Sequence, residues 1–400
     1  MTLRNTFIIT AALCIISSLS GRSETTNNNS ERAAQMINAI YDNYGIDGSK
    51  LLRENHPSDN RYKASYLANS TDKQPSNPYS YLWPFSGTLS AAVACYETTR
   101  NESWLKLIDE TVMPGLQRYY DNGRQPAAYS SYISDAPTSD RFYDDNIWLA
   151  LDFVDLYSAT GNKKWLDKSL EIWKFIESGR DSKLGDGIYW CEQKKGSKNT
   201  CSNAPAAVLA LKLYKATGSN EYLTAGTQLY DWTKANLQDP ADGLYFDNKS
   251  LDGKVQKHKF AYNSGQMLQA AALLYDITRK PEYLAEAQRL SKACYDHFFS
   301  VNDKNPIGPE KFINKGDIWF TAIMMRGFME LYRIDGNDEY VNAFIQNLDY
   351  AWRNLRDGYT GLMNSDWRGL DIDSRKWLLT QAAFAEMFAR AGSVKTGQSK

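Results

Sequence analysis

The sequence predicts an all-α protein in which six helical hairpins close into a ring, an (α/α)6 toroid of six inner and six outer helices. The main observation is a repeat, in which an apolar helix ending in a tyrosine is followed by a polar turn and a second helix that begins with an aromatic residue. The first helix of each unit is apolar almost all round and the second has a charged face, as expected of inner and outer helices. The marker residues lie 61, 57, 61, 57 and 56 positions apart: Tyr96, Tyr157, Tyr214, Tyr275, Tyr332 and Phe388.

The two ends of the repeat predict that the ring closes. The last unit, at 380–390, has no second helix after it, and the amphipathic segment 31–44 has no partner before it. These two segments can pair with each other. An open solenoid is the alternative, but it would need capping repeats, which the sequence lacks. A chain of 400 residues is long for one domain, yet repeat folds grow by adding units.

The N-terminal segment has the layout of a secretory signal peptide: Arg4, an apolar run from 7 to 16, and small residues near Ser20. We expect a signal peptide at 1–20, a disordered leader at 21–30 and a catalytic domain at 31–395. The mature protein is then secreted or periplasmic. A lipoprotein anchored at Cys14 is the less favoured alternative. No other window reaches the roughly 20 apolar residues that span a bilayer.

The composition argues against nucleic acid as a partner. The chain has 46 basic and 47 acidic residues, so it has no charge bias, and the sequence contains no long basic run that could follow a phosphate backbone. Eleven Trp and 26 Tyr are more than a core requires, and their flat amphipathic rings suit the faces of sugars. We expect a monomer that binds a carbohydrate.

The cysteines left after signal cleavage suggest one disulfide and no metal centre. Cys191 and Cys201 bracket a short polar loop, so export makes a bond between them plausible. Cys95 and Cys294 lie in apolar helical segments and are expected to be buried thiols. The chain has three His, none of them at ligand spacing from a cysteine, so we expect no zinc site and no cofactor.

The chemistry is expected where the inner helices begin, because in a closed toroid these helices run the same way and their N-termini meet at one face. Counting back from each marker places the helix starts at 83–85, 144–146, 202–203, 262–265, 317–320 and 375–377. Carboxylates, amides and indoles thus converge on one rim.

The doublet Asp144-Asp145 is the predicted catalytic pair. Helix capping would explain only one of the two carboxylates. Ser202 is expected to be a helix cap, and Asn263 either a cap or a ligand contact. Two carboxylates in one sugar-sized site are the equipment of a glycosidase, and such a pair should retain one proton near neutral pH. Their spacing leaves retention and inversion of the anomeric centre both open.

At these residues the sequence resembles glycoside hydrolase family 76, the endo-acting α-1,6-mannanases, which have an (α/α)6 fold. The resemblance implies a retaining mechanism with Asp144 as nucleophile and Asp145 as acid/base, acting on the α-1,6-linked mannose backbone of a mannan or on manno-oligosaccharides. Family members usually have Lys-Gly where this chain has Thr321-Ala322, and Gln where it has Ser264. The matching segments are 83–87, 143–148, 198–203, 243–247, 262–265 and 316–317 with Phe320.

Several other residues are candidates for sugar contacts: Trp83, Tyr143, Trp190, Asn203, Asp247, Tyr262, Asn263 and Asp317. The main alternative function is a mannan-binding protein without activity, although it would be expected to lack one doublet carboxylate. A magnesium-dependent isoprenoid enzyme would need a third aspartate, and a sugar epimerase would need histidine bases that the chain scarcely has. A uronyl hydrolase on the same toroid is a further choice.

Overall fold

The computed structural model describes residues 28–59, 64, 78–134 and 139–394. The predicted signal peptide, Cys14 and residue 395 lie outside this range. Helix α1 begins at Asn29, two residues before the predicted start of the domain. The predicted leader is wrong at this end, because Asn29 is 4% exposed and its side-chain oxygen accepts a hydrogen bond from Arg32 at 2.9 Å. Within the described range, no helix is long and apolar enough to cross a membrane.

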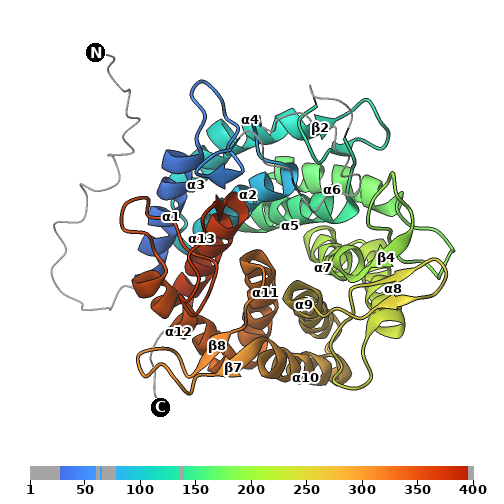
Figure 1. Cartoon of the computed structure of the whole chain (residues 1–400). Coiled ribbons are helices and arrows are strands. Elements are labelled where there is room, and N and C mark those ends of the chain that lie inside the picture. Colours follow the sequence, from blue (N-terminus) through green and yellow to red (C-terminus); the bar gives the residue numbers. More distant parts are fainter. Residues whose placement is uncertain (1–27, 60–63, 65–77, 135–138, 395–400) are drawn as a thin grey trace.

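Six inner helices in the described part of the chain surround one centre, and each packs on the next, α13 on α2 included (Figure 1). This confirms the predicted toroid. The inner helices are α2 (Leu82–Thr99), α5 (Tyr143–Thr160), α7 (Thr200–Thr217), α9 (Ala261–Thr278), α11 (Ile318–Asp335) and α13 (Leu378–Gly392).

The outer helices lie around this ring, and α1 packs on α13, which is the predicted closing pair. The second outer position is a broken helix, interrupted by a π-helical turn. In chain order the outer elements are α1 (Asn29–Tyr44), then α3 (Glu102–Leu107), η2 (Ile108–Val112), α4 (Met113–Leu116) and η3 (Gln117–Tyr119), followed by α6 (Lys163–Glu177), α8 (Asn220–Leu237), α10 (Pro281–Phe298) and α12 (Glu339–Asn354).

The marker tyrosines set the ends of the inner helices. In five of them the residue after the helix is left-handed, and its backbone N–H donates to the carbonyl oxygen of the marker tyrosine. This is the αL capping motif, which glycine favours. Glycine holds the position three times, at 161, 218 and 336. Each of these helices has 18 residues, so their first turns lie level with one another.

Polar contacts join every inner helix to the next and form a closed ring of links. One of these links joins Arg326 on α11 to Glu386 on α13 at 2.6 Å. The ring is completed by Ser90–Asp152 at 2.6 Å, Asp155–Lys212 at 2.6 Å, Lys215–Asp276 at 2.8 Å, Gln269–Glu330 at 3.2 Å and Arg390–Glu97 at 3.6 Å.

Short strands shape the loops that lead into the inner helices. They pair as β1 with β9, β2 with β3, β4 with β5 and β6, and β7 with β8, all antiparallel. Their bounds are β1 (Asn55–His56), β2 (Tyr120–Asp121), β3 (Ala128–Tyr129), β4 (Ser197–Asn199), β5 (Asn248–Ser250), β6 (Val255–Gln256), β7 (Phe299–Val301), β8 (Lys311–Ile313) and β9 (Lys376–Trp377).

Side-chain amides fasten three of these loops to the helix that follows. The fourth residue of α5, α7 and α13 is Asn146, Asn203 and Gln381, respectively. Each amide bonds to the backbone N–H and C=O of one loop residue, which is Tyr129, Ile188 or Met363 in the same order. The loops above the inner helices are therefore held in place by buried hydrogen bonds.

Candidate active site

The site lies at the end of the toroid where the inner helices begin. We call the second and third residues of these helices the N-terminal rim. Because the helices are level, these side chains meet. Ring contacts and electrostatic interactions link them across the ring, including Trp83 with Trp319 and Asp144 with Cys201. The rim comprises Trp83 and Pro84, Asp144 and Asp145, Cys201 and Ser202, Tyr262 and Asn263, Trp319 and Phe320, and Leu379 and Thr380.

Asp144 is partly exposed and accepts several hydrogen bonds. The indole N–H of Trp190 donates to its Oδ2 at 3.1 Å, and the backbone N–H of Asp145 donates to its Oδ1 at 3.2 Å. Cys201 also hydrogen-bonds its carboxylate. Burial raises the pKa of Asp144 to about 7, and these donors limit the rise.

The pKa of Asp145 is also raised. Its burial raises the pKa well above the ordinary value, and the charge of Asp144 raises it further. Among the described residues, no donor to its carboxylate is found that would stabilise the anion. The two adjacent carboxyl groups therefore differ in environment, and the doublet retains a proton on Asp145 when Asp144 ionises.

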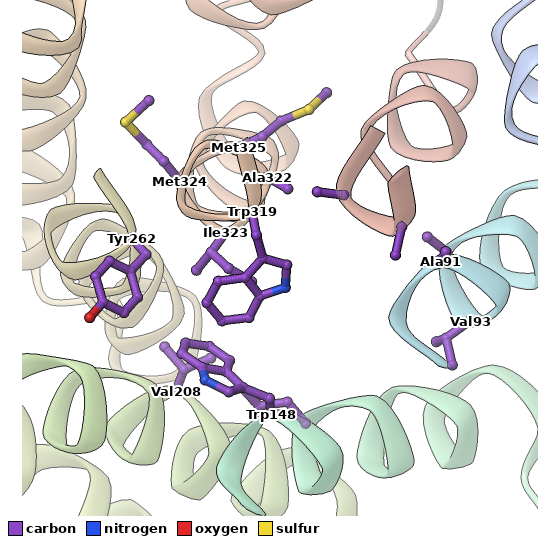
Figure 2. Close-up of a cluster of buried hydrophobic side chains, with 14 of the residues drawn as sticks. Ala91, Val93, Trp148, Val208, Tyr262, Trp319, Ala322, Ile323, Met324 and Met325 are labelled. Atoms are coloured by element: carbon purple, nitrogen blue, oxygen red, sulfur yellow. The ribbon is translucent and has the colours of Figure 1, made fainter. Parts of the chain in front are cut away.

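Aromatic rings form the floor and one wall of the rim. Trp148, one turn below the doublet on α5, meets Trp319 edge to face at 5.0 Å. Figure 2 shows these two indoles and Tyr262 converging from three helices in the middle of the ring. The ring of Tyr262 is stacked on Phe320 at 4.0 Å, and Trp83 contacts Phe320 and Trp377 at 6.2 and 5.3 Å. Partly exposed aromatic faces beside a carboxylate pair suit a sugar ring.

Two further carboxyl groups lie at the rim. Asp317 is the N-cap of α11, where its Oδ1 accepts the N–H of Trp319 at 2.8 Å, and burial raises its pKa to about 6. Burial also raises the pKa of Asp247, which interacts electrostatically with Cys201 and Tyr262.

Asn263 and Ser202 bring unused polar atoms to the rim. Asn263 is 1% exposed, and neither its Oδ1 nor its Nδ2 has a hydrogen-bond partner in the described structure; the same holds for Oγ of Ser202. The expected capping role of Ser202 is wrong, because α7 begins earlier and has Asn199 as its N-cap. Buried amide groups are normally paired, so Asn263 differs from Asn146 and Asn203 in keeping its hydrogen-bonding capacity unused.

Two of the residues predicted to contact sugar do not have side chains at the rim. Tyr143 is fully buried and stacks on Phe175 of α6 at 4.6 Å, because the first residue of α5 faces the outer helix. Asn203 is fully buried, and its amide is occupied by the backbone of Ile188 and Asn199. The other candidates, Trp83, Trp190, Asp247, Tyr262, Asn263 and Asp317, all lie at or beside the rim.

The predicted disulfide is wrong, since Cys191 and Cys201 are both free and buried. Cys201 is the second residue of α7 and lies against Asp144, so its side chain belongs to the rim. Cys95 and Cys294 are buried thiols, as predicted. Cys201 is a rim residue that was not among the predicted site residues, although its position in the repeat, level with Asp144, is a signal that could have identified it.

Comparisons with known proteins agree with this geometry. The family model described as glycosyl hydrolase family 76 matches residues 55–307. A solved family 76 mannosidase from Bacteroides thetaiotaomicron VPI-5482 is 32% identical, with a TM-score of 0.82 over 92% of this chain and 98% of that one. A structure of an inactive variant of the α-1,6-mannanase of Salegentibacter sp. HEL1_6, in complex with α-1,6-mannotriose, is 23% identical, with a TM-score of 0.72 over 91% of this chain and 99% of that one. At this lower identity, the similarity to the Salegentibacter enzyme shows that the two proteins share a fold.

Among curated proteins, the mannan endo-1,6-alpha-mannosidase DFG5 of Saccharomyces cerevisiae is 24% identical over 56% of this chain and 50% of its own length. The chain spans between a third and a half of the length of several curated relatives of this kind. The family model covers more than half of the chain, and the Bacteroides enzyme aligns along nearly all of it. The chain therefore belongs to glycosyl hydrolase family 76.

Proposed function

We propose that this protein is a retaining endo-α-1,6-mannosidase that cleaves the backbone of mannan, with Asp144 as nucleophile and Asp145 as acid/base. The observation that carries the proposal is the difference between the two carboxyl groups. Asp144 accepts hydrogen bonds that stabilise its anion, whereas the Asp145 carboxyl group, equally partly exposed, has no such donor among the described residues and has its pKa raised by the charge of Asp144. We infer that Asp145 holds the proton. A nucleophile and an acid need these two protonation states at the same pH.

The proposed reaction has two steps. In the first, a carboxylate oxygen of Asp144 bonds to the anomeric carbon while Asp145 gives its proton to the leaving glycosidic oxygen, so that the C–O bond breaks. In the second, Asp145 takes a proton from water, the water oxygen bonds to the same carbon, and the ester to Asp144 breaks. The configuration of the anomeric carbon is retained because it is inverted twice.

The substrate class is supported by relatives whose names specify it. The yeast relatives are described as mannan endo-1,6-alpha-mannosidases, and the Salegentibacter structure holds α-1,6-mannotriose in a variant with two consecutive aspartates replaced. In this chain, the unpaired amide of Asn263 and the partly exposed rings of Trp83 and Phe320 are suited to contact the sugars. We also propose export by the 1–20 signal peptide to a secreted or periplasmic location, and action as a monomer.

The test uses linear α-1,6-mannan and three variants: Asp144→Asn, Asp145→Asn and, as a control, Asp167→Asn on the exposed face of α6. The wild type should release a ladder of manno-oligosaccharides, and its first product should have the α configuration by proton NMR. Both doublet variants should lose at least about 1,000-fold in kcat/KM, which is the scale of a lost catalytic group. The control should behave as wild type.

Azide distinguishes the two roles. With an activated aryl α-mannobioside, Asp145→Ala should be rescued by azide and yield an α-glycosyl azide, since the nucleophile is still present. Asp144→Ala should yield a β-glycosyl azide or none. Binding of mannan without cleavage by the wild type would instead indicate a carbohydrate-binding protein.

A further inference from the structure

A free thiol lies inside the rim in contact with the proposed nucleophile. Cys201 and Asp144 are both the second residue of their inner helix, on the adjacent helices α7 and α5. The thiol of Cys201 hydrogen-bonds the carboxylate of Asp144 on one side and the hydroxyl of Tyr262 on the other. Tyr262 is the second residue of α9, the next inner helix. Three consecutive helices thus place a carboxylate, a thiol and a phenol in one row.

The surrounding contacts hold this row in place. The N–H of Thr200 donates to the carbonyl of Asp247 at 2.8 Å, which fixes the first turn of α7 and with it Cys201. Tyr262 is fixed by its stacking on Phe320. Cys201 is only 3% exposed, so its thiol is held within the packed first turns of the inner helices.

We propose that Cys201 is a positioning residue: its thiol donates a hydrogen bond to Asp144, while Tyr262 donates to the sulfur, and this relay keeps the proposed nucleophile ionised and correctly aimed. The inference rests on the proposed function of Asp144. It goes beyond that function because it assigns a role in positioning Asp144 to a buried thiol.

The charges around the row support the direction of the hydrogen bonds. Burial and the charges of Asp144 and Asp247 raise the pKa of Cys201 well above its ordinary value, so the thiol keeps its proton and can donate. A donor to the ionised form lowers the pKa of a carboxyl group. Among the described residues, the titratable groups that interact with Asp144 include Asp145 on its own helix, Cys201, Tyr262, and Cys191 in the loop before α7.

The test compares the pH dependence of kcat/KM on linear α-1,6-mannan for the wild type, Cys201→Ala, Cys201→Ser and the control Cys95→Ala. Cys95 is a buried thiol on α2, outside the rim. Cys201→Ala should move the acid limb about 0.5–1 pH unit higher, since Asp144 loses a donor. Cys201→Ser keeps a donor, so its limb should stay within about 0.2 unit of wild type, and Cys95→Ala should show no shift.

Two further readouts separate this role from a structural one. The melting temperature should not follow the shift in the acid limb across the four proteins. The difference between the Raman spectra of the wild type and Cys201→Ser identifies the S–H stretching band of Cys201. This band should shift in frequency when Asp144 is protonated and when Tyr262 is replaced by Phe. An acid limb that is unchanged in Cys201→Ala overturns the inference. Absence of mannanase activity in the wild type would instead refute the proposed function.

Discussion

The guanidinium group of Arg326 on α11 donates to both carboxylate oxygens of Glu386 on α13, at 2.6 and 2.9 Å, in the buried middle of the toroid. Arg390 donates to the same carboxylate at 2.7 Å. Burial alone would raise the pKa of Glu386, but the two guanidinium charges outweigh it and hold the pKa at about 2. The last inner helix is thereby joined to its neighbour by a fully paired carboxylate.

Glu386→Gln should destabilise the fold by about 3–5 kcal/mol, because it removes the closest anion of two buried guanidinium groups and leaves them only the more distant carboxylates of Asp152 and Glu97, at 3.8 and 3.6 Å. Urea unfolding measures this change. Disrupting the exposed pair Lys163–Asp167 through Asp167→Asn is the control and should cost less than about 1 kcal/mol. Since the pKa of Glu386 is depressed on folding, its contribution is present above the ordinary glutamate pKa and is lost as the pH falls toward 2. A variant as stable as wild type at pH 7 would contradict a role in closing the ring.

The activity should depend on pH through the doublet. Burial raises the pKa of Asp144 to about 7, and burial together with the charge of Asp144 raises the pKa of Asp145 well above its ordinary value. Only the form with Asp144 ionised and Asp145 protonated is active in the proposed mechanism. Hence kcat/KM should rise with a midpoint near pH 7 and fall again at higher pH. Initial rates between pH 4 and 10 check this, and a flat profile from pH 5 to 9 would exclude it.

Trp190→Phe should weaken catalysis by removing the N–H that donates to Asp144 Oδ2. A hydrogen bond to a charged group contributes about 1.5–3 kcal/mol, so kcat/KM should fall roughly 10- to 100-fold. The acid limb of the pH profile should also move upward. Trp173→Phe, on the outer helix α6, is the matched control and should leave both quantities unchanged. Equal effects of the two substitutions would show that indole packing, rather than the N–H, is what matters.

Asp145→Asn should abolish activity and yet stabilise the protein. The pKa of Asp145 is raised on folding, so at neutral pH the native state either takes up a proton or carries a buried anion, and both cost free energy. This cost appears as the pH rises above the ordinary aspartate value, and the neutral amide avoids it. Melting temperature should rise by about 1–3 °C at pH 7, with a smaller gain near pH 4. A variant that melts below wild type at pH 7 would refute this electrostatic reading.

Asn263→Ala should mainly lower activity and Asn203→Ala should mainly lower stability, although both residues lie in the first turn of an inner helix. Asn263 has no partner within the described structure, so its loss should leave stability nearly unchanged and lower kcat/KM about tenfold or more through lost sugar contacts. Asn203 binds two backbone carbonyls and one N–H, so its loss should cost about 1–3 kcal/mol of stability. Substrate kinetics and urea unfolding on the same two variants measure both quantities.

The repeat in the sequence was sufficient to predict the toroid, the closing pair and the helix that begins with the doublet. The reason is local: a marker tyrosine, a left-handed capping residue and an apolar helix are each determined by neighbouring residues, and 18-residue helices then place the starts level. The pairing of 31–44 with 380–390 followed from the absence of any other partner.

Only the tertiary structure decided which residue of each first turn faces the rim. Successive helical residues point about 100° apart, so a change of one or two positions in where a helix begins exchanges inward and outward side chains. Hence Tyr143 faces α6 while Asp144 faces the rim, and Asn203 binds its own loop while Asn263 is left unpaired. The same rotation places Cys201 against Asp144 and leaves it without a disulfide bond to Cys191. Sequence spacing along one helix cannot reveal contacts between helices, because they depend on how the neighbouring helices are rotated about their axes.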